Sequence, residues 1–161
     1  MKSGLLMSNL TFLVNRNKPF PLGYLVGDWS FQDDETDLVS SKLKSVDLSR
    51  IRLVTMLKDG EERISGEVKR ERLKLSGCVK LDSFILQTLL DNKHLIPESW
   101  KEELDGRIRF IFFDGTVLLG REKEQNVLCL YWYWGDWQVG CRELSTEFND
   151  GWNEYFPSAV L

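Results

Sequence analysis

The sequence predicts an α+β protein in which a helical N-terminal half packs on a C-terminal antiparallel β-meander of two hairpins. Two observations carry this prediction. Between residues 65 and 92, apolar residues recur at helical spacing, and capping residues flank each run. After Gly106, apolar and aromatic runs are separated by Asp-Gly or Gly-Asp pairs, which is typical of hairpins.

We expect three regions that share one core, because 161 residues are enough for one well-buried core. Residues 1–48 form an irregular arm with short strands and an acidic loop. Residues 49–105 are mainly helical, and residues 106–161 form a tryptophan-rich meander. The carboxylates at 33–37 lack the ligand spacing and central glycine of a calcium loop, so they indicate a solvated turn.

The helical region begins after a strand at 50–57. A first helix is expected from Ser65 to its C-cap, Gly77. A second helix is expected at about 82–92, and a short third helix or turn after Pro97. The face of the first helix expected to be buried carries Val68, Arg72 and Leu75.

The first hairpin is expected to join strands 107–113 and 116–119. Its turn is assigned to Asp114-Gly115, because both central residues of a type I′ turn need positive φ. Phe113 and Thr116 would then be cross-strand neighbours.

The second hairpin is expected to join strands 126–134 and 137–142 across Gly135-Asp136. This register pairs Trp134 with Trp137, and side chains then alternate between two faces. The predicted core face carries Leu128, Leu130, Trp132, Trp134, Trp137, Val139 and Cys141. The predicted exposed face carries Cys129, Tyr131, Tyr133, Gln138, Gly140 and Arg142.

Composition restricts the partners and the compartment. The net charge of −4 disfavours non-specific attraction to nucleic acid, and no apolar run is long enough to span a membrane. The N-terminal apolar run is interrupted by polar residues, which disfavours a secretory signal. Three cysteines without a CxxC pair (Cys78, Cys129 and Cys141) favour reduced thiols and a cytoplasmic location.

Catalytic and metal chemistry finds little support in the residues. The run from Phe112 to Val117 resembles the first motif of the haloacid-dehalogenase-like phosphatases, but Phe112 occupies the position of the nucleophilic Asp. The single histidine, His94, has no cysteines near it at the spacing of a zinc site. The sequence also has no nucleophile-elbow motif, which disfavours a catalytic triad that includes His94. Phosphate-binding glycine loops are absent. We therefore predict no cofactor, no metal and no catalytic residue.

The C-terminal third is the most plausible binding surface, because tyrosine, arginine and asparagine offer contact area at small entropic cost. The expected binding residues are Tyr131, Tyr133, Gln138, Arg142, Asn149, Asn153 and Tyr155. The partner would be a protein or a small ligand. Two alternatives stay open: a small hydrolase or transferase with an unrecognised site, and an oligomer-forming structural subunit.

The chain from about Ile96 onward resembles uncharacterised small proteins of the candidate phyla radiation bacteria. The matching stretches are LIPESWKE, FIFFDGTVL, VLCLYW and PSAVL, and the block 53–90 is similar too. Such proteins are associated with diversity-generating retroelements, which substitute residues at codons that contain adenine. The resemblance implies a diversified target protein, in which Trp132, Trp134, Trp137 and Trp152 stay fixed because the tryptophan codon lacks adenine.

Overall fold

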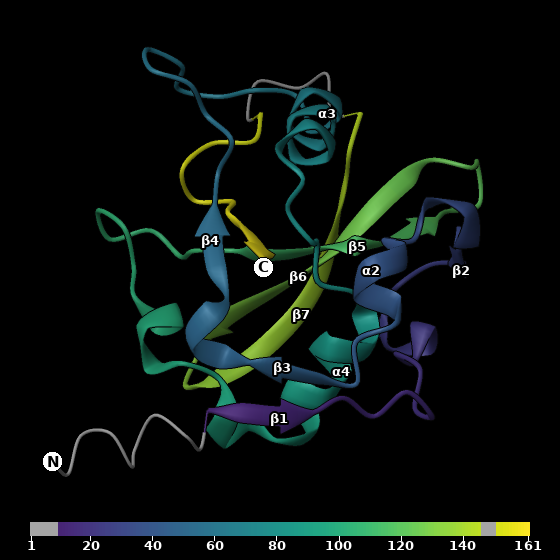
Figure 1. Ribbon diagram of the computed structural model, residues 1–161. Helices are drawn as coiled ribbons and strands as arrows, with labels where there is room; N and C mark the ends of the chain where they lie inside the picture. The colour runs from purple at the N-terminus through teal and green to yellow at the C-terminus, as the bar shows by residue number, and fades with distance from the viewer. Residues whose placement is uncertain (1–9, 146–150) are drawn as a thin grey trace, which may run out of the picture.

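The computed structural model describes residues 10–145 and 151–161, and its fold is α+β with helices mainly in the middle of the chain (Figure 1). The α-helices of the described residues are α2 (Leu38–Ser41), α3 (Gly66–Ser76) and α4 (Ser83–Asp91). Short 3-10 helices cover Leu22–Tyr24, Asp33–Glu35, Leu48–Arg50, Lys93–Leu95 and Glu98–Lys101.

The described residues form a mixed six-stranded sheet in the order β4-β8-β5-β6-β7, and β2 pairs with the far end of β5. Its strands are β2 (Ser30–Phe31), β4 (Arg52–Val54), β5 (Ile111–Leu119), β6 (Gln125–Tyr133), β7 (Asp136–Glu143) and β8 (Ser158–Val160). The pair β5-β8 is parallel, whereas the other pairs are antiparallel. A separate two-stranded sheet joins β1 (Thr11–Leu13) to β3 (Ser45–Asp47).

The first half of the described chain is less helical than expected, because besides short 3-10 helices it holds only α2 and α3. It also holds the short strands expected in the arm (β1 to β3), and β4 lies within the strand expected at 50–57. Each of these strands has only two or three residues. Strands this short are too brief for their exact bounds to be read from an alternating pattern.

The large sheet is covered by apolar side chains on both faces. Leu128 and Leu130 of β6 belong to a first core with the apolar side of α4 and the small β1-β3 sheet. Val127 and Cys129 of the same strand belong to a second core on the other face, with Trp152. Because β6 is buried on both sides, its sequence is almost continuously apolar.

The helix caps follow the sequence. Ser65 Oγ accepts the N–H of Val68 at 3.1 Å at the start of α3, and Gly77 ends this helix at φ 72°. The predicted inner face of α3 is wrong, because Leu75 is 78% exposed and Val68 is 40% exposed. The buried positions are Gly66, Lys69 and Leu73. A lysine at the centre of the buried face broke the apolar pattern on which the prediction relied.

The predicted turn at Asp114-Gly115 is also wrong. Strand β5 runs straight through this pair, and four residues, 114–117, lie opposite the single residue Val127 of β6. This is a β-bulge larger than the common type with two residues opposite one. The backbone of residues 80–82 crosses β5 here, and Gly115 donates its N–H to the carbonyl of Leu81 at 2.9 Å. Gly115 is needed for close backbone approach and has no positive φ.

The β6-β7 hairpin exists, but its turn lies one residue earlier than predicted. Trp134 and Gly135 occupy the loop with φ of 54° and 74°, and Trp132 pairs with Trp137. Moving the turn by one residue leaves every other side chain on its predicted face, because side chains alternate on both strands. Trp134 is the exception: it is 87% exposed instead of being in the core.

Candidate functional site

The predicted binding residues separate into two groups. Arg142, Asn153 and Tyr155 line one hollow. Tyr131 borders this hollow, because its ring lies 4.8 Å from that of Phe110, which also lines it. The other group, Tyr133 and Gln138, lies near the β6-β7 turn and does not line this hollow. Asn149 lies outside the described residues.

The face of β6-β7 expected to be exposed is open only near the turn. Tyr133 is 47% exposed, whereas Cys129 is 4% exposed and belongs to the second core. Burial raises the pKa of the Cys129 thiol to about 12, so this cysteine is not a reactive thiolate. Trp152 and Phe156 from the last segment pack over this part of the face, which explains its burial.

Two hollows, of about 480 and 430 Å³, share the lining residues Arg107, Asn153 and Tyr155. We call them together the C-terminal groove. Its walls come from the loop at 57–63, the segment 106–110 and the last segment of the chain.

Backbone hydrogen bonds hold these walls together. The N–H of Phe110 donates to the carbonyl of Tyr155 at 2.8 Å, and Ile64 and Trp152 exchange two bonds at 3.0 and 2.6 Å. The side chain of Asn153 accepts the N–H of Tyr155 at 2.9 Å. The groove is therefore built on fixed backbone, which lowers the entropic cost of binding.

Two guanidinium groups of the groove lie on aromatic rings. That of Arg107 lies 5.1 Å from the centroid of Tyr155, and that of Arg142 lies 4.5 Å from the centroid of Phe156. Arg142 also donates to the carbonyl of Gly151 at 3.3 Å. Burial raises the pKa of the Tyr155 hydroxyl, and the charge of Arg107 opposes this shift. A cation–π contact of this kind holds a guanidinium in place and leaves its N–H groups able to donate.

Lys69 holds Phe156, one of the residues that line the groove. It is buried, donates to the carbonyl of Phe156 at 2.6 Å, and lies 5.2 and 4.7 Å from the ring centroids of Phe112 and Trp152. Burial lowers its pKa to about 8, against the attraction of Asp114. The hydrogen bond from Lys69 fixes the position of Phe156. Because Lys69 is only 1% exposed, it does not contact a partner.

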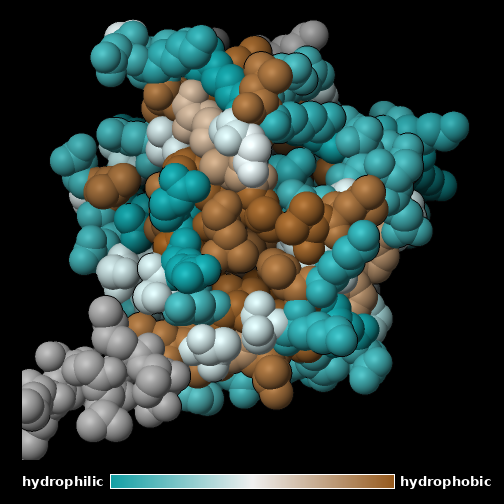
Figure 2. Space-filling view, viewed as in Figure 1, coloured by the Kyte–Doolittle hydropathy of each residue, from teal (hydrophilic) through white to brown (hydrophobic). Residues whose placement is uncertain are grey.

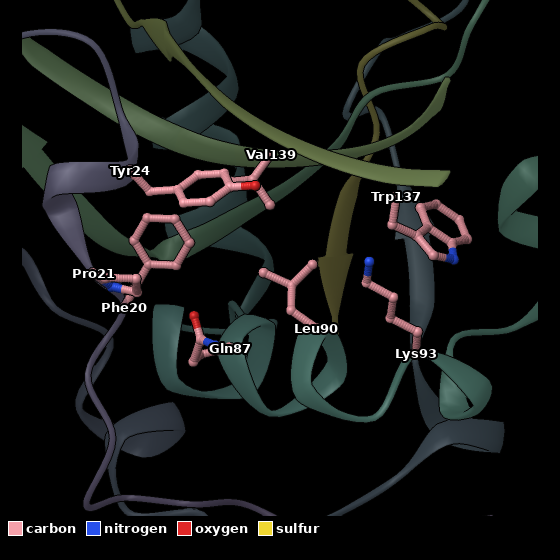
Figure 3. Close-up of a pocket in the computed structure, with 8 residues that line it drawn as sticks. All are labelled: Phe20, Pro21, Tyr24, Gln87, Leu90, Lys93, Trp137 and Val139. Atoms are coloured by element: carbon pink, nitrogen blue, oxygen red, sulfur yellow. The ribbon is translucent and has the colours of Figure 1, made fainter. Parts of the chain in front are cut away.

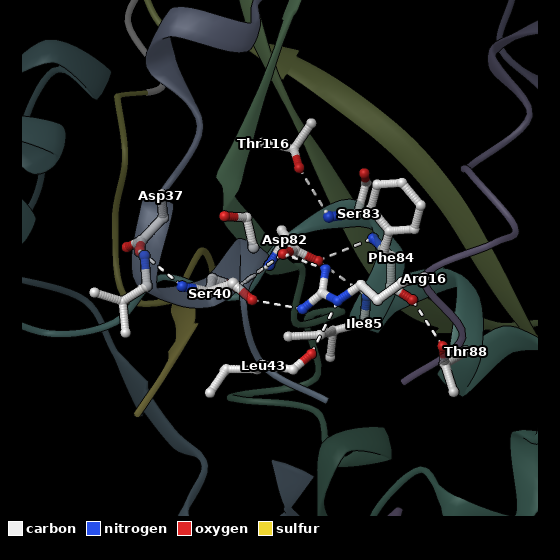
Figure 4. Close-up of polar contacts among 12 residues, drawn as sticks. Arg16, Asp37, Ser40, Leu43, Asp82, Ser83, Phe84, Ile85, Thr88 and Thr116 are labelled. Carbon is white, nitrogen blue, oxygen red and sulfur yellow. Dashed lines mark hydrogen bonds and ion pairs between the residues drawn. The ribbon is translucent and has the colours of Figure 1, made fainter. Parts of the chain in front are cut away.

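The polar cluster at the start of α4 is structural (Figure 4). Asp82 accepts the N–H of Phe84 at 3.0 Å and the guanidinium of Arg16 at 2.8 Å. The hydroxyl of Thr116 accepts the N–H of Ser83 at 2.9 Å. The first donors of the helix are thus bonded within the chain, and they do not form an anion site.

An apolar surface area lies between β4 and α2, around the C-terminal end of the chain (Figure 2). The partly buried side chains of Ile51, Leu53 and Leu161 pack against the first core. An oligomer-forming subunit would need an apolar area of this kind.

Within residues 10–145 and 151–161, no three His, Cys, Asp or Glu side chains come together as metal ligands. No helix in the described part of the chain is long and apolar enough to cross a membrane. His94 is exposed on the 3-10 helix Lys93–Leu95.

The sequence prediction missed Arg63 and Arg107. A local signal for Arg107 was available, because Asp105-Gly106 precedes it. These two residues have φ of 51° and 73°, and Leu104 and Arg107 exchange hydrogen bonds of 3.0 and 2.9 Å across them. This is the positive-φ Asp-Gly turn that the sequence prediction assigned to residues 114–115. It places Arg107 at the start of the groove wall.

No family model, no curated protein and no solved structure matches the chain.

Proposed function

We propose that the protein is a non-enzymatic recognition protein whose C-terminal groove binds an acidic side chain of a partner protein. The observation that carries this proposal is the guanidinium of Arg107, which lies over the ring of Tyr155 where the two hollows meet. Arg63 lines one of these hollows, and in the described part of the chain neither guanidinium has a hydrogen-bond acceptor. Oriented guanidinium groups bind carboxylates with two hydrogen bonds.

The form of the groove favours a protein partner over a small molecule. Small-molecule sites are enclosed and mostly apolar. The C-terminal groove instead has arginine, glutamate, asparagine and tyrosine side chains along two hollows. Its carboxylates also restrict the partner. Glu61 is already paired with Arg72 at 2.8 Å, but Glu62 and Glu154 line the hollow as well. A single acidic side chain therefore fits better than a run of acids, which these glutamates would repel.

A hydrolase or transferase has less support in the groove. A general acid or base needs a pKa near neutrality. The pKa of the Glu61 carboxyl is shifted the other way, to about 2, by the hydrogen bond from Arg72. Glu61 therefore stays ionised and is better suited to holding the loop than to transferring protons.

The experiment is a selection of random peptides displayed on phage, first on the wild-type protein and then on variants. We expect enriched peptides that share one acidic residue, and Arg107→Ala should lower their affinity by about tenfold or more, as for a central interface arginine. Arg107→Lys should recover only part of this affinity, because lysine has no planar guanidinium to bind both carboxylate oxygens.

The matched control is Arg121→Ala, which removes an exposed arginine from the loop between β5 and β6. It should leave the affinity within about twofold, and all variants should melt together. The proposal is refuted if no peptide is enriched over an unrelated control protein. It is also refuted if Arg121→Ala weakens binding as much as Arg107→Ala.

We further propose, from the resemblance to retroelement-associated proteins, that residues around the groove are diversified while tryptophans are retained. The burial of Trp152 at 1% exposure and Trp137 at 6% supports this, because replacing either would damage the core. Exposed Trp134 gains no such support. The test is the flanking DNA: a near-copy of the 3′ end should differ at adenines, and differences spread over all four bases would refute diversification.

A further inference from the structure

A cavity of about 160 Å³ lies on the other face of the sheet, apart from the C-terminal groove (Figure 3). It is bounded by the segment 20–24, by α4, by Lys93 at the start of the following 3-10 helix, and by β7. Six of its eight lining residues are apolar or aromatic, and the other two are Gln87 and Lys93. Unlike the C-terminal groove, this cavity therefore has the apolar lining and few polar groups of a small-ligand site.

The inner walls of the cavity are fixed by packing, whereas Tyr24 at its rim is 71% exposed. Phe20 and Trp137 are 3% and 6% exposed and belong to the first core. The segment 20–24 is held by a 3-10 turn, in which the backbone N–H of Tyr24 donates to the carbonyl of Pro21 at 3.0 Å. Leu25, 9% exposed, anchors the end of this turn in the core. The inner walls of the cavity are therefore preformed.

The size of the cavity defines the apolar part of a ligand. A cavity of about 150 Å³ with aliphatic and aromatic walls holds one benzene molecule. The cavity here has about the same volume, so it has room for one six-membered ring. A fused two-ring system or a long acyl chain would exceed it.

The polar end of the cavity defines the charge of the ligand. Figure 3 shows the nitrogen of Lys93 turned inward, at the opposite end from the rings of Phe20 and Tyr24. This ammonium is 2.9 Å from Asp136 at the hairpin turn. Both side chains are about half exposed (48% and 54%), so the ion pair is weak and Lys93 can pair with another carboxylate at little cost.

We propose that this cavity binds a small acid with one aromatic ring, of the arylacetate type, with its ring between Phe20, Leu90 and Val139 and its carboxylate on Lys93. The ring replaces water against apolar walls, and the carboxylate forms a charge-assisted hydrogen bond with the ammonium. This site does not depend on the C-terminal groove, because the two share no lining residue.

The test is a titration of the isotope-labelled protein with phenylacetate, followed by two-dimensional amide NMR. Phenylacetamide, which keeps the ring and loses the charge, and acetate, which keeps the charge and loses the ring, are the comparison ligands. We expect saturable shifts at the amides of Gln87, Leu90 and Val139, with a dissociation constant below about 1 mM, as a ligand of this size allows. Phenylacetamide should bind about fivefold more weakly, and acetate should not saturate.

Two variants locate the ligand. Lys93→Met should remove the preference for phenylacetate over phenylacetamide while phenylacetamide binds as before, whereas Lys44→Met, at an exposed lysine elsewhere, should change neither affinity. Val139→Phe should fill the cavity and abolish binding of both ring ligands. If Val139→Phe fails to fold, the Lys93→Met comparison still decides. The proposal is overturned if phenylacetate shows no saturable shift, if the shifts cluster elsewhere, or if Lys93→Met keeps the preference for the acid.

Discussion

Replacing Gly115 by alanine should destabilise the protein through a backbone collision. The added Cβ would lie 2.2 Å from the carbonyl oxygen of Lys80, 2.7 Å from the carbonyl carbon of Leu81 and 2.8 Å from the nitrogen of Asp82. These are all backbone atoms, so relief requires the crossing segment to move by about 1 Å, given contact distances of about 3.5 Å. Overpacking costs about 1–3 kcal/mol, and we expect the upper end here. The melting temperature should fall by about 6–12 °C.

The assay is thermal and urea unfolding followed by tryptophan fluorescence. Gly23→Ala is the matched control, because a Cβ at Gly23 meets nothing within 4 Å and its φ is also not positive. This control should stay within about 0.5 kcal/mol of wild type.

A third variant distinguishes the collision from the turn predicted by sequence. In a type I′ turn, asparagine would be tolerated better than alanine, because asparagine readily adopts positive φ. In the crossing, the larger asparagine at position 115 should destabilise at least as much as alanine. The reasoning is refuted if Gly115→Ala melts with the Gly23→Ala control, or if asparagine is the milder substitution.

Two further predictions concern buried charges. Asp82→Ala should lower the unfolding free energy by about 3 kcal/mol, because it removes a helix cap and leaves Arg16 without its carboxylate. A loss below about 1 kcal/mol, measured by urea unfolding, would contradict this. The pKa of Lys69 is about 8 in the folded protein against 10.5 unfolded, so the unfolded chain holds the proton more tightly, and stability from this group rises as pH increases from about 8 to 10.5. The unfolding free energy of wild type relative to Lys69→Met should rise by about 2–3 kcal/mol over this range, while the opposite trend from Cys129 is common to both proteins and cancels. Parallel pH curves for the two proteins would show that Lys69 keeps an ordinary pKa.

Features decided by nearby residues could be predicted from the sequence. Ser65, Asp82 and Gly77 cap their helices because the bonds and the positive φ involve only residues within the same turn. The two faces of β6-β7 were also predictable, since alternation survives a turn displaced by one residue.

The candidate site was predicted in part. Arg142, Asn153 and Tyr155 meet in the C-terminal groove, because the residue types suited to recognition gather in one stretch of the chain. Arg63 joins them only because Ile64 pairs with Trp152, a contact between residues 88 positions apart that no local pattern reveals. The apolar cavity is likewise assembled from three distant segments.

The two Asp-Gly pairs show where the sequence alone stops. Asp105-Gly106 forms the expected turn, with both residues at positive φ, and its neighbours Leu104 and Arg107 bond across it. Asp114-Gly115 has the same chemistry and stronger apolar flanks, yet it stays extended inside β5. The difference lies in a segment more than 30 residues away, at 80–82, whose backbone needs the space that only glycine leaves. The sequence by itself determined that each pair contains a glycine, which permits a tight turn or a close backbone contact. Tertiary packing decided that Asp105-Gly106 became a turn and Asp114-Gly115 a crossing.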